Sequence, residues 1–212
     1  MVKIGGGLLR TEGLDGLRRA CAEAIELARD RPVLVVPGGG PFADAVRAVD
    51  AQVDLADDVA HALALRAMDQ LGTLLAPLLP SAEPLMRLVV PRSLALVLAA
   101  QAFGDRPEVP QSWAVTSDSL AVLAAGAIGA EEAILLKPVA GVVARPYDAP
   151  ARGMTAGELE ALQDAGGGRA VDPYLPEAVR RTGVTVVVRA PGGNGTWITP
   201  ASTLDAPVSG GE

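Results

Sequence analysis

The chain has few of the side chains on which several kinds of catalytic site depend, because its 212 residues include one cysteine and one histidine. The single cysteine, Cys21, excludes an intrachain disulfide and fits a reducing compartment. Its Ala- and Leu-containing surroundings favour a packed thiol over a nucleophile. One histidine and one cysteine are too few for a His/Cys zinc site, and we expect no protein metal site. A hydrolase triad would have to use His61, and no G-x-S-x-G turn is present.

Aromatic residues and basic stretches are also scarce. Aromatic side chains make up 3% of the chain and hydrophobic residues 50%, so Ala, Leu and Val must form most of the core. A net charge of −7, with scattered basic residues, argues against a nucleic-acid partner. The most apolar region, 85–103, contains Arg87, Pro91 and Arg92 and is not typical of a membrane span. Since no signal peptide is evident, we expect a cytoplasmic protein without a membrane partner.

Two glycine loops each follow a short apolar run. The run 33–36 leads through Pro37 into Gly38, Gly39 and Gly40, and 1–4 leads into Gly5, Gly6 and Gly7. Glycine lets a backbone approach a ligand closely, and the start of a following helix favours an anion. The pair therefore predicts one phosphate group held between the two loops, beside Lys3. The alternative is that both loops are only tight strand-to-helix turns.

Strand and helix patterns alternate along most of the chain. We expect strands at 1–4, 33–36, 86–90, 113–116, 133–137 and 184–188. We expect helices at 14–30, 42–50, 55–75, 93–102, 117–128, 155–163 and 176–182. This order predicts a three-layer αβα sandwich with a mostly parallel sheet. We expect one domain over 1–200, a loop at 145–153, a Gly-, Pro- and Ser-rich end from 192 that is partly disordered, and a disordered tail at 201–212.

Several polar side chains are predicted to lie at the carboxyl edge of this sheet, where ligands bind in parallel α/β folds. They are Lys3, Ser117, Asp118 and Ser119 at a helix start, Lys137 at a strand end, and Asp172 before a helix that contains Arg180. Cations, carboxylates and glycine loops suit phosphoryl transfer, which depends on positioning and charge neutralisation. Each residue also has an ordinary structural explanation, such as a helix cap, a helix-dipole partner or a solvent contact.

His61 lies within an Ala- and Leu-rich helical stretch. A lone histidine in such a helix is most often structural. The alternative is that it holds a substrate phosphate as a hydrogen-bond donor.

Four stretches resemble the amino acid kinase family: VKIGGG, VVPGGGPFADAVR, the TSDS helix start and ILLKPVAGV. DLADDVAHALALRAMDQLG, QSWAVTSDSLA and AVDPYLPEAV resemble the branch that acts on (aminomethyl)furanmethanol phosphate. The resemblance covers roughly residues 1–190. It implies an αβα sandwich and phosphoryl transfer from ATP, with Mg²⁺, to make a diphosphate precursor of the cofactors methanofuran and methylofuran. An amino-acid kinase and an isopentenyl phosphate kinase remain alternatives.

The resemblance also implies roles for individual residues. Lys3 would neutralise the transferred group, Asp118 would orient the cations, and Arg180 would supply a second catalytic charge. The six loop glycines would cradle phosphate with their amides. Lys137 would lie on the nucleotide side. The remaining residues would lie on the substrate side: His61, Ser117, Ser119 and Asp172.

The chain departs from the family pattern at three points. Gly7 replaces a serine, Ala140 replaces the aspartate of an Asp-Gly pair, and 189–193 replaces an Asn-Gly turn with its basic segment. The departures favour a second hypothesis, a non-catalytic member that binds a phosphorylated metabolite or another oxyanion. The Ala/Leu-rich helices also make a homo-oligomer an expectation.

Overall fold

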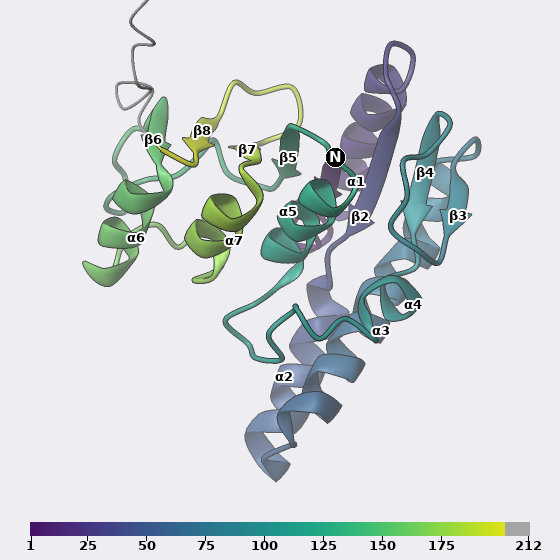
Figure 1. The fold of residues 1–212 in the computed structure, drawn as a ribbon, viewed down its shortest axis with the longest axis horizontal. Coiled ribbons are helices and arrows are strands. Elements are labelled where there is room, and N and C mark those ends of the chain that lie inside the picture. The colour runs from purple at the N-terminus through teal and green to yellow at the C-terminus, as the bar shows by residue number, and fades with distance from the viewer. Residues whose placement is uncertain (202–212) are drawn as a thin grey trace, which may run out of the picture.

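Eight strands form the sheet at the centre of the computed structural model, which describes residues 1–201 (Figure 1). The order across the sheet is β3-β4-β2-β1-β5-β7-β8-β6, and every neighbouring pair is parallel except β7 with β8. The strands are β1 (Val2–Ile4), β2 (Val33–Pro37), β3 (Glu83–Leu85), β4 (Leu94–Val97), β5 (Glu132–Leu136), β6 (Gly153–Thr155), β7 (Thr185–Arg189) and β8 (Thr196–Thr199).

Seven α-helices and one 3₁₀ turn surround the sheet in the described residues. They are α1 (Gly7–Leu27), α2 (Gly40–Val53), α3 (Asp57–Leu75), η1 (Ala76–Leu78), α4 (Ala99–Phe103), α5 (Ser117–Ala127), α6 (Ala156–Asp164) and α7 (Leu175–Thr182). Helices α2 and α3 run side by side and extend beyond the sheet (Figure 1). Within residues 1–201, no helix combines the length and hydropathy of a membrane span.

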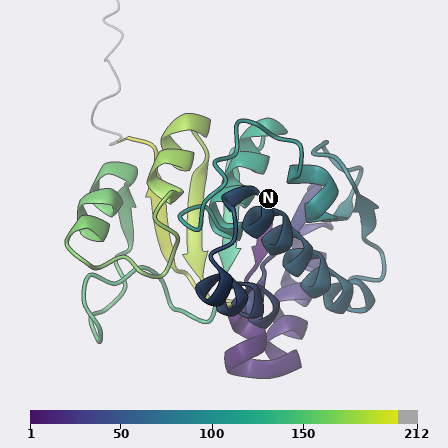
Figure 2. The same cartoon turned by 90° about the horizontal axis from the view of Figure 1, so that it is seen from below.

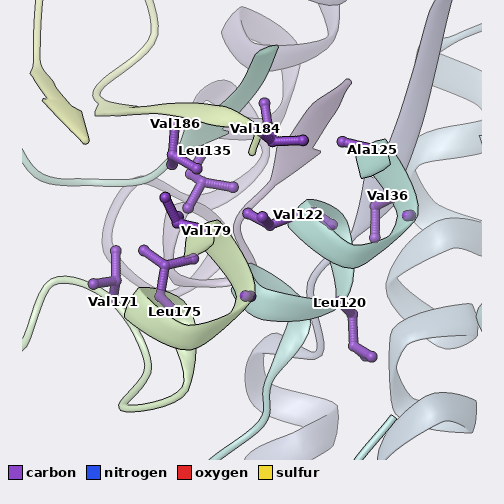
Figure 3. Packing of buried hydrophobic residues seen from close by; sticks show 14 of the residues in the cluster. Val36, Leu120, Val122, Ala125, Leu135, Val171, Leu175, Val179, Val184 and Val186 are labelled. Carbon is purple, nitrogen blue, oxygen red and sulfur yellow. The ribbon is translucent and has the colours of Figure 1, made fainter. Parts of the chain in front are cut away.

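The buried residues form one core on each face of the sheet, as β-strand alternation requires. Ile134 and Leu136 pack with α1 on one face, while Leu135 packs with α5 and α7 on the other. Figure 2 shows the helices on the two sides of the sheet, and Figure 3 shows Leu135 among Val122, Val179 and their neighbours. The predicted αβα sandwich with a mostly parallel sheet is therefore confirmed.

Three predicted elements are wrong. The segment 86–90 is not a strand, 93–102 is not one helix, and 113–116 is a turn. Leu94–Val97 is a fully buried strand paired with β2, and only Ala99–Phe103 is helical. A short apolar run has the same sequence pattern whether it forms a buried strand or a buried helix. Here the parallel pairing with β2 determines that the run is a strand. The turn at 113–116 is closed by a bond from the Val115 amide to the Ser112 carbonyl.

The edge of the sheet also differs from the prediction. The loop predicted at 145–153 ends where Gly153 begins β6, which also includes residue 155 of the predicted helix, and residues 196–199 in the Gly-rich end form β8. Both strands are short and pair with each other, so neither carries a strong pattern of its own. The capping box of Thr155 and Glu158 at the start of α6 is confirmed. The disordered tail predicted at 201–212 lies outside the described residues, except for residue 201.

Candidate active site

The two glycine loops pack directly against each other at the carboxyl edge of the sheet. The Gly38 amide donates to the Ile4 carbonyl at 2.8 Å, and the Gly5 amide donates to the Leu136 carbonyl at 2.8 Å. These bonds extend the sheet, so Gly5 and Gly38 hold the loops in place and do not present free amides. A Cβ added to Gly6 would lie 2.2 Å from the Cα of Gly40. Glycine is therefore required where the loops meet.

The other four loop glycines line a cavity of about 220 Å³. Within residues 1–201, the amides of Gly6, Gly7, Gly39 and Gly40 have no hydrogen-bond acceptor. Gly7 begins α1 and Gly40 begins α2, so the positive ends of two helix dipoles point toward this cavity. The arrangement can receive an anion, as the sequence predicted for the loops as a pair.

Gly6→Ala should therefore destabilise the protein, because the added methyl group would overlap backbone atoms that cannot move aside. We expect a loss of about 3 kcal/mol, typical of overpacking, and a melting temperature lower by about 6–12 °C. Thermal unfolding followed by circular dichroism measures the change. Gly157→Ala is the matched control, since no atom lies closer than 4.0 Å to its added Cβ. Equal melting temperatures for the two variants would contradict the close packing of the loops.

Both lysines of the chain contact one carboxylate beside these loops. Lys3 Nζ lies 2.7 Å from Asp118 Oδ1, and Lys137 Nζ contacts Asp118 Oδ2. Lys3 projects from β1 toward α5, Lys137 follows β5, and Asp118 lies in the first turn of α5. Lys3 and Asp118 are buried, whereas Lys137 is partly exposed to the cavity. Two ammonium groups and one carboxylate give this cluster a charge of +1.

The charges of this cluster depend on one another. Burial lowers the pKa of Lys3, and the nearby Asp118 carboxylate opposes that shift. Burial alone would raise the pKa of Asp118, but Lys137 and Lys3 hold it well below its usual range. Asp118 therefore remains ionised at neutral pH and accepts hydrogen bonds from both lysines. It can align two cations but is poorly suited to accept a proton.

Asp172 lies behind the cluster and anchors the start of α5. Its Oδ2 accepts hydrogen bonds from the Thr116 amide at 2.9 Å, the Thr116 hydroxyl at 2.8 Å and the Ser119 amide at 3.0 Å. Its Oδ1 accepts a bond from the Ser119 hydroxyl. Burial raises the pKa of Asp172, and the charge of Asp118 raises it further. Asp172 and Ser119 do not line the cavity, so these two predicted substrate residues hold the helix start that presents Asp118.

The outer part of the cavity carries residues that the sequence analysis missed. Arg10 and Arg47 share Asp44, at 2.6 and 3.2 Å, and the guanidinium of Arg47 lies 4.7 Å from the centre of the Trp113 ring. The Trp113 indole N–H donates to Asp50 at 2.6 Å, which fixes the ring. The spacing in the sequence could have indicated both arginines, because Arg10 lies one helical turn after the first glycine loop and Arg47 lies two turns after the second.

Two other predicted residues, His61 and Ser117, line the same cavity. His61 projects from α3, and burial lowers its pKa, which favours the neutral imidazole at neutral pH. Ser117 is the first residue of α5 and is buried beside Asp118. The structure thus brings together Lys3, Asp118, Lys137, His61, Ser117 and four of the six glycines.

Comparison with known proteins identifies the family. A sequence model described as the amino acid kinase family matches residues 1–190. The chain belongs to the amino acid kinase family. As such it is a small-molecule kinase, and its predicted membership is confirmed. A [5-(aminomethyl)furan-3-yl]methyl phosphate kinase of Methanocaldococcus jannaschii is 28% identical over 147 residues, which cover 67% of each chain.

Solved kinase structures share the fold at low sequence identity. An aspartate kinase from Synechocystis superposes with a TM-score of 0.74 at 17% identity; the match covers all of this chain and 41% of that one. A uridylate kinase from Archaeoglobus fulgidus gives a TM-score of 0.69 at 19% identity and covers 93% and 99% of the two chains. At these identities the likeness shows the fold alone.

Arg180 does not contact the cluster of Lys3, Lys137 and Asp118. It is exposed on α7, where it pairs with Glu160 at 2.9 Å and Glu177 at 3.2 Å, and it does not line the cavity. The prediction that Arg180 supplies the second catalytic cation is therefore not supported by its position, and Lys137 occupies that place beside Asp118. The chain contains only two lysines against sixteen arginines, a scarcity that could have marked Lys137 in the sequence.

The end of β7 and the segment after it contact α1. Arg189, the last residue of β7, pairs with Glu23 of α1, and the Gly192 amide donates to the same carboxylate at 2.8 Å.

Proposed function

We propose that this kinase transfers a phosphoryl group from ATP to the phosphate of a small phosphorylated metabolite, namely [5-(aminomethyl)furan-3-yl]methyl phosphate, in the biosynthesis of furan one-carbon cofactors. The observation that carries the proposal is the contact of Lys3 and Lys137 with Asp118, beside four glycines that line the same cavity. The 28% identical relative bears a name that specifies this acceptor.

Phosphoryl transfer to a phosphate acceptor requires mainly charge neutralisation and positioning, which the two lysines and the glycine amides can provide. A phosphate monoester is already ionised near neutral pH, so its attacking oxygen needs no general base. Lys3 and Lys137 would neutralise charge on the transferred group, and the glycine amides would hold its oxygens. Asp118 would keep both ammonium groups in place and would not itself carry a proton.

The glycine amides and the two lysines of the cavity could bind the phosphates of ATP. They could hold Mg²⁺ only together with the nucleotide, because the described residues of the cavity offer no set of protein ligands for the ion alone. Within residues 1–201, no group of three His, Cys, Asp or Glu side chains could hold a metal. When bound with ATP, Mg²⁺ would supply charge neutralisation between the phosphates, with few protein ligands, as is common for this ion.

The size of the cavity favours a small acceptor. Its volume of about 220 Å³ is below the range of about 300–1,000 Å³ typical of drug-sized ligands. Its outer part adds Arg10, Arg47 and the neutral His61, which suit an anionic acceptor. A phosphorylated five-membered ring meets both conditions.

The test is turnover by the intact protein. Incubated with Mg-ATP and [5-(aminomethyl)furan-3-yl]methyl phosphate, it should form ADP and the corresponding diphosphate in equal amounts. A coupled assay measures ADP, and ³¹P NMR detects the new diphosphate. ADP formation no faster than with ATP alone would contradict the proposal.

One observation favours a second candidate, a member that binds a phosphorylated metabolite without turnover. Arg189 is paired with Glu23, and Ala140 stands where the family has an acidic residue, so the nucleotide side has fewer available charged groups than the family pattern. Calorimetry separates the candidates, because this one requires binding of the phosphorylated acceptor and no binding of Mg-ATP.

We also propose a cytoplasmic homo-oligomer. The single cysteine is compatible with a reducing compartment. Exposed apolar side chains occur on the neighbouring helices α2 and α3, at Val49, Val53, Val59 and Leu63. Mass photometry at micromolar concentration tests self-association, and a monomer alone would contradict it.

A further inference from the structure

A small side cavity adjoins the main one between α3 and the turn at 112–115. Its volume is about 20 Å³, enough for one group the size of a water molecule. His61, Ala64, Trp113 and Val115 line both cavities. Lys3 and Lys137 line only the main cavity, whereas Asp57 lines only the side cavity. The two cavities therefore place cations at one end and a carboxylate at the other.

Asp57 is the one side chain of this side cavity that is charged when His61 is neutral. The ion pairs of this region join Arg10 and Arg47 to Asp44 and leave Asp57 out. Burial lowers the pKa of His61, so the imidazole between the two cavities does not add a competing positive charge at neutral pH. Arg47 already stacks on the Trp113 ring, so the group of the side cavity that favours a further cation is the carboxylate of Asp57.

We propose that Asp57 binds the primary ammonium group of the acceptor and is the residue that selects an amine-bearing substrate. The inference rests on the function proposed above, in which the acceptor phosphate must lie beside Lys3. An acceptor so placed would run past the apolar side chains of Leu65 and Met68, and a short aminomethyl arm would enter the side cavity. An ammonium group has three donors and the compact size that this cavity admits.

A variant pair and an acceptor pair test this assignment. Asp57→Asn removes the charge, and Asp58→Asn is the matched control. Asp58 lies in the same first turn of α3, its Oδ1 accepts a bond from the Val59 amide, and it does not line the cavity. The two acceptors are [5-(aminomethyl)furan-3-yl]methyl phosphate and the analogue with a methyl group in place of the aminomethyl group.

Asp57→Asn should raise KM for the amine-bearing acceptor by about tenfold, the size expected for one charged hydrogen bond to a carboxylate that is exposed before the acceptor binds. It should leave kcat, KM for ATP and KM for the methyl analogue within about twofold. Asp58→Asn should change none of these values. Equal effects of Asp57→Asn on the two acceptors, or equal effects of the two variants, would overturn the assignment.

The outcome also separates this inference from the proposed function. If the parent protein turned over neither acceptor, the proposed function would fail, and calorimetric binding of the two acceptors would still decide the role of Asp57. Tighter binding of the amine by the parent, lost in Asp57→Asn, supports it. Equal binding of both acceptors by the parent overturns it.

Discussion

Lys3→Met should lower kcat by about 100-fold or more while the protein still folds. The substitution keeps most of the side-chain volume but removes a buried positive charge that lies 2.7 Å from Asp118. Preorganised charges of this kind are worth on the order of 10²–10³ in rate when one is removed. Lys137 would then neutralise the transferred group alone. Steady-state kinetics with saturating Mg-ATP and acceptor measures the loss.

An exposed cation provides the control for this prediction. Arg18→Met removes a charge that pairs with Asp15 on the surface of α1, and it should leave kcat within about twofold. The pH profile gives a second measurement. Because burial lowers the pKa of Lys3, the rate of the parent should fall at an alkaline pH below the ordinary lysine value of about 10.4. A kcat for Lys3→Met within threefold of the parent would show that the reacting centre lies elsewhere.

Much of this site could be predicted because its parts follow directly from local sequence. Val33–Pro37 is a buried strand that runs into three glycines, and the loop after it can only turn sharply. Lys3, Asp118 and Lys137 each lie at or near a strand end or helix start, and a parallel sheet brings those positions to one edge. The cluster thus depends on topology that the alternating pattern already implied.

The remaining features depend on contacts between distant segments. Arg180 and Lys137 are both candidate second cations, and only the tertiary structure shows that Arg180 pairs with Glu160 on the surface while Lys137 contacts Asp118. The sequence pattern predicts a strand around Trp113, but this residue lies in a turn and its indole bonds Asp50, 63 residues away in the sequence. Leu94–Val97 is a strand because β2 offers it a parallel partner. No local pattern contains such information.

Asp118→Asn should reduce both turnover and stability, and a second substitution can separate the two effects. The amide cannot balance two ammonium groups, one of them fully buried, so Lys3 and Lys137 would repel each other. Breaking a buried ion pair from one side typically costs about 3–5 kcal/mol, and the misaligned cations should lower kcat by about 100-fold. Chemical denaturation and steady-state kinetics measure the two losses.

Asp118→Asn/Lys137→Met should regain much of the lost stability, because it removes the repulsion, but should regain no activity. The pH dependence has a definite sign. Since the pKa of Asp118 is lower in the folded protein than its ordinary value of about 3.9, its stabilising effect is fully present above that value and declines as the pH falls. The stability gap between the parent and Asp118→Asn should therefore narrow below about pH 4. Recovery of turnover in the double variant would show that Asp118 only relieves charge repulsion and does not align the lysines for phosphoryl transfer.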